Sequence, residues 1–270
     1  MQKQAKYEFL IILLLLTLCF SSFSYADKYT LVIEPTFPVD QGKQVYEPLR
    51  QWLNKKTGHT FEIFIDNNYY FYWRNANGSR MPDFTLDAPH IAAYRAEKKN
   101  YSIIATTIEK LSYHLISLDV PADGESIQDY MVSKKIVMLP SPSLASVYFN
   151  KWFTDLFAAP KKDVTALSWQ ETIEIVFDGS AEAAIVPNWM FDLYPNFATL
   201  SESEKIPGTT FTASPNVPKA VVAQFKEALL ALQGEDDAAY DVLVELNTKA
   251  FVEPNLDDYK DLIKLIPGIF

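Results

Sequence analysis

A serine-rich turn at residues 139–146 is the segment of this sequence best suited to hold an anion. It reads Leu139-Pro-Ser-Pro-Ser-Leu-Ala-Ser146 and joins a predicted strand to a predicted helix. The first backbone N–H groups of a helix have no partner within it, and the helix dipole adds partial positive charge there. The hydroxyls of Ser141, Ser143 and Ser146 would supply further donors without a buried lysine. Equally, Ser141 or Ser143 could simply cap the helix, as serine commonly does.

A second strand-to-helix connection, residues 83–90, carries two more candidate ligand groups. Asp87 and His90 lie beside the predicted N-terminus of the next helix. His90 could donate a hydrogen bond to an anion, and Asp87 could accept one from an amine on the ligand. The alternative, that both are surface residues of an ordinary turn, is equally well supported.

Two further candidates are Glu182 and Tyr70. Glu182 immediately precedes an apolar strand predicted at 183–186, so it should lie near a sheet edge, although a solvated loop carboxylate is the commoner situation. Tyr70 belongs to Tyr69-Tyr-Phe-Tyr-Trp73, a predicted helix with one face in the core. The other face could present tyrosine hydroxyls and ring faces to a ligand, although core packing is the default for most of these aromatics.

The sequence contains no pattern typical of a metal centre, a cofactor site or a catalytic nucleophile. Its three histidines, His59, His90 and His114, lack the spacing of zinc ligands. There is no nucleophile elbow, phosphate-binding P-loop or dinucleotide-binding glycine pattern, and only 8 glycines are available to build one. We therefore expect a protein that binds rather than catalyses, with no cofactor and no metal.

The N-terminus is typical of an export signal. A short basic segment precedes an apolar run at 9–20, and the polar stretch after it ends in Ser24-Tyr25-Ala26, a small-x-small pattern. About a dozen apolar residues are too few to span a bilayer core of roughly 30 Å. We predict cleavage after Ala26. An uncleaved anchor is one alternative, and a lipid-modified Cys19 is another, although Leu18 stands where lipoprotein signals usually carry Gly or Ala.

The charge of the chain disfavours nucleic acid as a partner. The formal charge is −10, and it becomes −11 once Lys3, Lys6 and Glu8 leave with the signal segment. Nucleic-acid phosphates require clusters of Lys and Arg, whereas a small anion can be held by helix N-termini and backbone N–H groups alone. The mature chain of about 244 residues (270 minus 26) has no cysteine, so disulfides are excluded. It has no later apolar run of membrane-spanning length, and we expect it to be soluble.

Apolar periodicity predicts alternating strands and helices along the mature chain. The expected strands are 29–33, 61–65, 83–86, 103–106, 113–118, 135–139 and 183–186, and the main helices are 44–56, 68–77, 89–98, 143–157, 168–177 and 218–232. Gly58 should end the first helix, and Ser168 with Glu171 forms a capping box. This order favours α/β architecture, in which ligands lie beyond the carboxyl ends of strands. That rule selects the connections at 83–90 and 139–146.

Five segments resemble, in order, the phosphate/phosphite/phosphonate-binding proteins of ABC uptake systems, the PhnD-like periplasmic solute-binding proteins. They are 45–58 ("Y-x-P-L … T-G"), 83–89 ("D-L-A-x-L-G-P"), 142–148 ("P-S-S-T-S-G-Y"), 179–184 ("G-x-A-D-A-A") and 214–218. The likeness covers essentially the whole mature chain. Ala145 and Val147 stand where the family has Thr and Gly, and Glu182 replaces Asp. These differences leave two alternatives: a ligand of different size, or an anion without phosphorus.

The resemblance implies a two-lobed α/β protein with the type II periplasmic binding protein fold. Each lobe would be a mainly parallel sheet flanked by helices, and the hinge would have two chain crossings. After a signal peptide at 1–26, lobe 1 would comprise 27–112 and 213–270, and lobe 2 would comprise 113–212. Closure on a ligand would create the surface that a permease recognises.

The resemblance further implies an exported, monomeric component of an ABC-type uptake system that captures a small phosphonate- or phosphate-like oxyanion. Ser143 and Ser146 would hold the anion with the N–H groups around them, and Tyr70 and His90 would contribute from the other lobe. Ser141, Asp87 and Glu182 complete the candidate ligand set. The partner would be an ABC permease in the inner membrane. The alternative is an exported sensor or interaction protein on the same scaffold, with an altered pocket and a membrane sensor kinase as partner.

Overall fold

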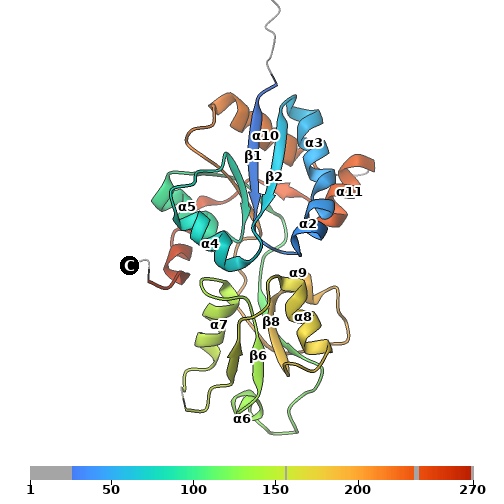
Figure 1. Cartoon of the computed structure of the whole chain (residues 1–270), viewed down its shortest axis with the longest axis vertical. Coiled ribbons are helices and arrows are strands. Elements are labelled where there is room, and N and C mark those ends of the chain that lie inside the picture. Colours follow the sequence, from blue (N-terminus) through green and yellow to red (C-terminus); the bar gives the residue numbers. More distant parts are fainter. Residues whose placement is uncertain (1–25, 156, 234–236, 269–270) are drawn as a thin grey trace, which may run out of the picture.

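The computed structural model describes residues 26–155, 157–233 and 237–268, which form two lobes (Figure 1). The blue N-terminal and the orange to red C-terminal segments build the upper lobe, lobe 1, while the green and yellow middle of the chain builds lobe 2. The predicted signal segment up to residue 25, with Cys19, lies outside the described residues. Within the described chain, no helix is long and apolar enough to cross a membrane.

Lobe 1 is built on a six-stranded sheet with the order β11-β4-β10-β3-β1-β2. The strands are β1 (Lys28–Ile33), β2 (Thr60–Ile65), β3 (Phe84–Asp87), β4 (Ser102–Thr107), β10 (Thr210–Ala213) and β11 (Phe251–Val252). The helices are α2 (Val39–Val45), α3 (Glu47–Thr57), α4 (Tyr69–Asn77), α5 (Pro89–Lys99), α10 (Lys219–Leu230) and α11 (Asp237–Glu245), followed by the 3-10 helices η1 (Leu256–Tyr259) and η2 (Leu262–Leu265). β1 is parallel to β2 and β3, and β10 is antiparallel to β3 and β4.

Helices from both ends of the chain share the core of lobe 1. Phe84 of β3 stacks on Phe225 of α10 with ring centroids 4.0 Å apart. Trp52 of α3 donates its indole N–H to the Ala228 carbonyl of α10 at 2.7 Å. The α3 helix ends at Gly58, whose φ of 73° is left-handed, as predicted. The C-terminal segment is therefore an integral part of lobe 1.

Lobe 2 is a five-stranded sheet with the order β7-β6-β8-β5-β9. Its strands are β5 (Tyr113–Ser117), β6 (Lys135–Val137), β7 (Lys161–Asp163), β8 (Ala183–Pro187) and β9 (Ala198–Glu202), and its helices are α6 (Ile127–Met131), α7 (Leu144–Trp152), α8 (Trp169–Phe177) and α9 (Asn188–Phe191). β6 is parallel to β7 and β8, whereas β5 is antiparallel to β8 and β9. The two-lobed α/β fold is confirmed, but both sheets are mixed rather than mainly parallel.

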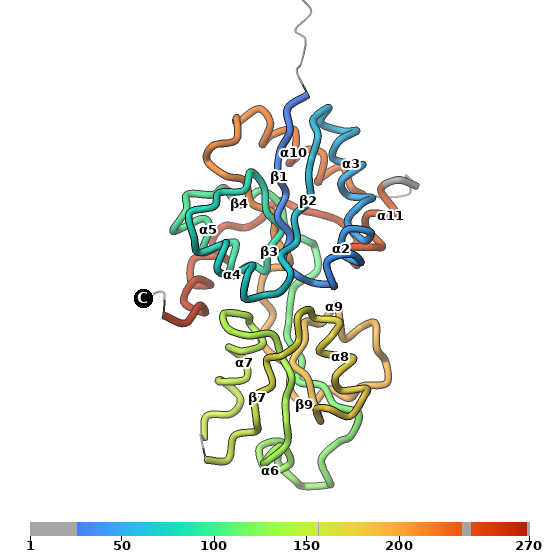
Figure 2. Tube along the Cα trace, viewed as in Figure 1, coloured from blue at the N-terminus to red at the C-terminus, as the bar shows by residue number. Residues whose placement is uncertain are grey.

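The chain crosses between the lobes twice, as Figure 2 allows the reader to follow. The first crossing joins β4 to β5 and the second joins β9 to β10. The two are paired, because Leu111 donates to the Ile206 carbonyl at 3.0 Å and Ile206 donates back at 2.9 Å. Since residues 210–213 form β10 in the sheet of lobe 1, the return occurs before Thr210 and not after residue 212.

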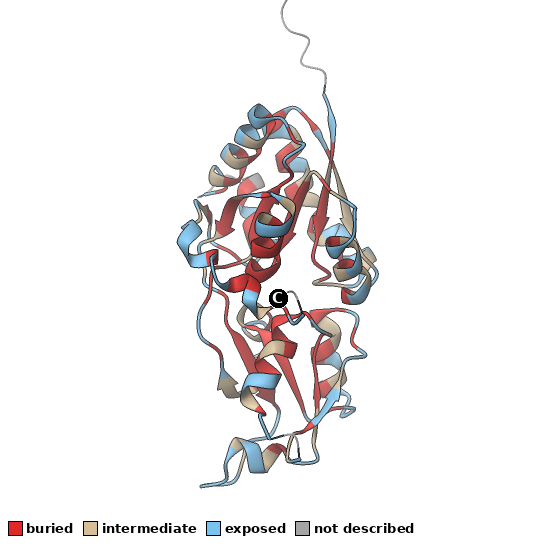
Figure 3. Ribbon diagram, turned by 90° about the vertical axis from the view of Figure 1, so that its left-hand side faces the viewer, coloured by how far each residue is buried: buried red, intermediate tan, exposed pale blue. Residues whose placement is uncertain are grey.

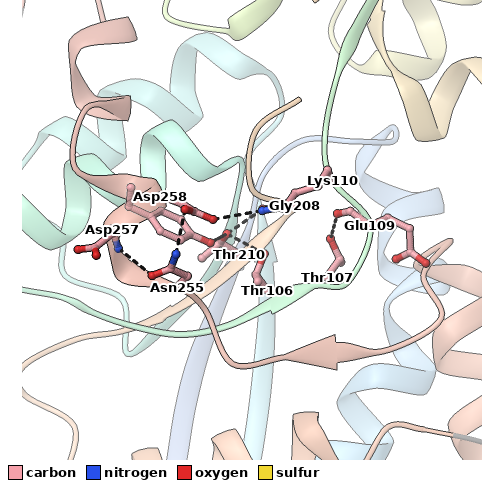
Figure 4. A network of polar contacts seen from close by, with 10 residues as sticks. Thr106, Thr107, Glu109, Lys110, Gly208, Thr210, Asn255, Asp257 and Asp258 are labelled. Atoms are coloured by element: carbon pink, nitrogen blue, oxygen red, sulfur yellow. Dashed lines mark hydrogen bonds and ion pairs between the residues drawn. The ribbon is translucent and has the colours of Figure 1, made fainter. Parts of the chain in front are cut away.

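A polar network fastens the crossings to the C-terminal segment (Figure 4). The Thr210 hydroxyl lies 2.8 Å from that of Tyr259, and Lys110 pairs with Asp258 at 3.2 Å. The crossings also approach each other closely at Gly208. A Cβ there would lie 2.0 Å from Thr107 Oγ1 and 2.4 Å from the Glu109 carbonyl oxygen, so glycine is required for this contact.

The two lobes pack against each other through buried apolar side chains. One apolar cluster includes Tyr69 and Ile91 of lobe 1 together with Tyr113, Leu144 and Trp169 of lobe 2. Figure 3 shows buried residues on both sides of this contact. The two lobes are therefore packed directly against each other at this interface.

Candidate ligand-binding site

Four helices begin at the contact between the lobes. The residues at or next to their starts are Tyr69 (α4), His90 (α5), Leu144 (α7) and Trp169 (α8), and all four are buried. The α5 helix follows β3 directly, at the carboxyl end of the parallel strands of lobe 1. Helix N-termini carry partial positive charge and unpaired N–H groups. The contact is thus electrostatically suited to an anion.

Ser143 is the N-cap of α7. Its buried hydroxyl donates to the Leu139 carbonyl at 2.7 Å and accepts the Ser146 N–H at 3.3 Å. Ser146 is also buried, whereas Ser141 is exposed. Among the described residues, this arrangement leaves the N–H groups of Leu144 and Ala145, in the first turn of α7, without a hydrogen-bond partner. In this loop the backbone, more than the Ser143 hydroxyl, can serve an anion.

The capping of α7 by Ser143 should contribute to the stability of the protein. Ser143→Ala should lower the free energy of unfolding by about 1 kcal/mol, because the Ser146 N–H loses its partner in a buried position. Urea unfolding followed by far-UV circular dichroism measures this. Ser141→Ala, at the exposed serine of the same turn, is the control and should leave stability within about 0.5 kcal/mol. Equal effects of the two substitutions would contradict the capping role.

His90 connects the two lobes directly. Its Nε2 lies 3.0 Å from the Pro142 carbonyl oxygen, so Nε2 carries the proton and α5 is joined to the turn before α7. The ring is completely buried, and burial lowers the pKa of His90 to about 4. Nδ1 is then an acceptor, and it has no partner among the described residues. Neutral His90 therefore offers a lone pair, and the expected donation to an anion is not available from it.

Asp87 lies inside lobe 1 as part of a buried ion pair. It accepts hydrogen bonds from Tyr72 Oη at 2.6 Å, Thr85 Oγ1 at 2.5 Å and Arg95 Nε at 2.6 Å. Asp87 is completely buried and Arg95 is 2% exposed. With three donors already bound, Asp87 is neither the surface residue nor the free ligand group that the sequence suggested.

The aromatic helix α4 presents a different tyrosine from the predicted one. Tyr70 is 63% exposed and packs edge-on against Phe71, whereas Tyr69 is completely buried at the lobe contact. The Tyr69 hydroxyl has no hydrogen-bond partner in the described part of the chain. Burial, together with the nearby Glu34 carboxylate, raises the pKa of Tyr69 well above its ordinary value. The Tyr69 hydroxyl is thus neutral and could donate a hydrogen bond to a ligand.

Glu182 lies at the opposite end of lobe 2. Its Oε2 accepts the backbone N–H of Lys135 at 2.6 Å, where β6 and β8 begin, and its side chain is exposed. The carboxyl ends of these parallel strands face lobe 1, so Glu182 is separated from α7 by the length of the sheet. Of the seven predicted residues, the structure brings Ser143, Ser146 and His90 together at the contact and leaves Tyr70, Ser141 and Glu182 exposed.

Glu34 is the residue at the contact that the sequence interpretation missed. It follows β1 directly, is 7% exposed, and its Oε2 accepts the Ala88 N–H at the start of α5 at 2.7 Å. The Trp169 side chain of lobe 2 lies close to Glu34 and acts to lower its pKa, as the Ala88 N–H does. Burial outweighs both effects and raises the pKa of Glu34 to about 7. An acidic residue directly after the first strand was the available signal, by the same rule that selected the other connections.

Two cavities adjoin this contact on the side of the crossings. A small one of about 30 Å³ is lined by Glu34, Ala88, Tyr113 and Trp169, among others. A second cavity, of about 310 Å³, shares six lining residues with it. None of the seven predicted residues lines either cavity. Among the described residues, no group of three or more His, Cys, Asp or Glu side chains could hold a metal ion.

Comparison with known proteins identifies the family. A family model described as the periplasmic phosphonate substrate-binding protein of an ABC transporter matches residues 31–259. PhnD1 from Prochlorococcus marinus, in complex with methylphosphonate, superposes with a TM-score of 0.74 at 13% identity, covering 88% of this chain and 96% of that one. A binding-protein component of an ABC phosphonate transporter from Pseudomonas aeruginosa gives 0.70 at 14% identity, covering 88% and 83%.

A Xanthomonas citri protein bound to ATP also shares the fold, with a TM-score of 0.63 at 11% identity over 88% of this chain and 95% of that one. No curated protein sequence matches the chain significantly. At such low identity the solved structures support the fold alone, whereas the family model spans most of the chain. The chain therefore belongs to the family of periplasmic phosphonate substrate-binding proteins of ABC transporters.

Proposed function

We propose that this protein captures a small phosphonate-like oxyanion between its two lobes and delivers it to an ABC permease in the inner membrane. The signal segment would be removed after Ala26 during export. The mature protein would act as a monomer and would carry out no chemistry on its ligand. Lobe 1 would supply the N-terminus of α5 and Tyr69, and lobe 2 would supply the N-terminus of α7.

The observation that carries this proposal is the meeting of α5 and α7 across the lobe contact. His90 Nε2 and the Pro142 carbonyl, 3.0 Å apart, join the first turn of α5 to the turn before α7. An anion between two helix N-termini from different lobes is bound fully only when the lobes are closed. Binding would therefore favour closure, because a ligand shifts an equilibrium by its preference for one state. The paired crossings at Leu111 and Ile206 are a suitable hinge.

Ligand binding should raise the melting temperature of the mature protein. A ligand that binds only the folded state stabilises it by about 2.7 kcal/mol at 100 times its Kd. Methylphosphonate, phosphite, phosphate and methylsulfonate would be tested by thermal shift, and positive ligands by isothermal titration calorimetry. We expect methylphosphonate to be among the positive ligands. No shift with any of these anions at millimolar concentration would contradict the proposal.

The unpartnered hydroxyl of Tyr69 allows a sharper test. Tyr69→Phe removes no hydrogen bond of the ligand-free protein, so its stability should be unchanged or slightly higher. Its affinity for methylphosphonate should fall by at least about tenfold, because a hydrogen bond to a charged group is lost. Tyr70→Phe, the exposed neighbour, is the matched control and should bind like the wild type. If Tyr69→Phe also binds like the wild type, the anion lies elsewhere.

A further inference from the structure

We propose that the ligand carries an apolar substituent of about six carbons, or an aromatic ring, which occupies a pocket beside the hinge. This inference rests on the proposed function and specifies its ligand class. The hinge-side pocket is the cavity of about 310 Å³ bounded by Phe37 and Val45 of lobe 1, Trp189 and Leu193 of lobe 2, and Leu111 of the first crossing. Its volume is at the lower end of the range for small-molecule sites, about 300–1,000 Å³.

The walls of this pocket are chemically suited to hydrocarbon. Two apolar side chains at its edge, Leu193 and Val244, are each 55% exposed. Several polar lining groups are already bound within the protein. Glu109 accepts from Thr248 Oγ1 and from the Lys249 N–H.

Two of the amide side chains that line the pocket are engaged in the same way. Asn188 accepts the Ser112 N–H and donates to the Lys110 carbonyl, and Asn247 donates to the Trp189 carbonyl. A polar substituent would have to compete with these bonds, whereas an apolar one would cover Leu193 and Val244. Burying apolar surface is favourable in proportion to its area.

The pocket adjoins the small cavity at the lobe contact, and the two share walls. Six residues line both it and the small cavity beside Glu34: Thr36, Tyr46, Leu86, Leu111, Trp189 and Thr209. A ligand whose polar group lies at the contact would reach this pocket past these shared residues. Because the walls come from both lobes, a substituent there would also stabilise the closed arrangement. A methyl group would fill little of this space, which holds about ten times the liquid volume of a water molecule, ~30 Å³.

The experiment compares methylphosphonate, hexylphosphonate and phenylphosphonate by isothermal titration calorimetry on the mature protein. Each buried methylene strengthens binding by about fourfold, so hexylphosphonate should bind at least ~100-fold more tightly than methylphosphonate. Phenylphosphonate should also bind more tightly than methylphosphonate. If methylphosphonate binds and the larger ligands bind no better, this inference is overturned and the proposed function stands. If none of the three binds between pH 5 and pH 8, this inference is overturned, and the proposed function falls with it unless phosphite, phosphate or methylsulfonate binds.

A pair of leucine substitutions locates the substituent. Leu193→Glu places a charge at the edge of the pocket and should weaken hexylphosphonate binding by at least about tenfold, since a charge beside hydrocarbon must be desolvated. It should leave methylphosphonate binding unchanged. Leu167→Glu is the control, because Leu167 is similarly exposed (49% against 55%) and lies outside the pocket. Equal effects of the two substitutions on hexylphosphonate binding would overturn the inference.

Discussion

Replacing Arg95 with methionine should lower the free energy of unfolding by about 3–5 kcal/mol, because it leaves the Asp87 carboxylate buried without its counter-charge. Arg95 Nε and Asp87 Oδ2 are 2.6 Å apart, and neither side chain is more than 2% exposed. Tyr72 and Thr85 also donate to Asp87, but neutral donors compensate only part of the lost charge. Urea unfolding at pH 7 measures the difference. The loss is a large fraction of the stability of an ordinary domain.

Two controls separate the ion pair from the general effect of losing an arginine. Arg50→Met breaks an ion pair with Glu47 on the partly exposed face of α3, and it should cost less than about 1 kcal/mol. Adding Asp87→Asn to Arg95→Met removes the uncompensated charge and should recover part of the loss. A double variant no more stable than Arg95→Met would contradict the electrostatic explanation and point to lost packing instead.

The fold was largely predictable because its signals are local. Gly58 ends α3 and Ser168 caps α8 as the sequence indicates, and each depends on residues within four positions. The strand β10 was missed for the opposite reason. It has only four residues, too few for its polar/apolar alternation to stand out, and it is defined by pairing with β3, more than 120 residues earlier in the chain. Such pairing leaves no local trace, so the return crossing was placed three residues late.

The site was predictable as a set of loops but not as a set of side chains. The rule that ligands lie beyond strand carboxyl ends selected the turns that contain His90 and Ser143. Which groups remain free depends on contacts made after folding, such as the Arg95–Asp87 pair. In α4, five consecutive aromatic residues hide the helical periodicity, so Tyr69 and Tyr70 were indistinguishable in the sequence.

Replacing Glu34 with glutamine should stabilise the protein above pH 7 by up to about 3 kcal/mol, and hardly at all near pH 4.5. The folded-state pKa of Glu34 is raised to about 7 from an ordinary value of 4.5, because the carboxylate is buried. Between these two pH values the folded protein keeps a proton that the unfolded chain has lost. The stability that Glu34 contributes is therefore complete below about pH 4.5 and is lost as the pH rises through 7. Glutamine has no charge to bury and can still accept the Ala88 N–H.

The measurement is urea unfolding of both proteins at several pH values from 4.5 to 8.5, taking the difference in free energy at each. Taking the difference removes the opposing contribution of His90, whose pKa is lowered to about 4 and whose stabilising effect is lost as the pH falls from 6.5 toward 4. Glu227→Gln, at an exposed position on α10, is the control and should show no such trend. A difference that stays constant with pH would contradict the buried, protonated Glu34.

The same substitution should affect anion binding. A charged Glu34 at the lobe contact would repel an oxyanion, so a ligand bound near it favours the protonated form and its binding is coupled to proton uptake. We therefore expect Glu34→Gln to bind methylphosphonate severalfold more tightly than the wild type at pH 8, and the two proteins to converge near pH 5. Calorimetry in buffers of different ionisation enthalpy would measure how many protons the protein takes up on binding. At pH 8 the wild type should take up more protons than the variant. Tighter binding by the wild type at pH 8 would instead mean that Glu34 contacts a cationic group, and the ligand would then be an amine-bearing phosphonate held by charge at both ends.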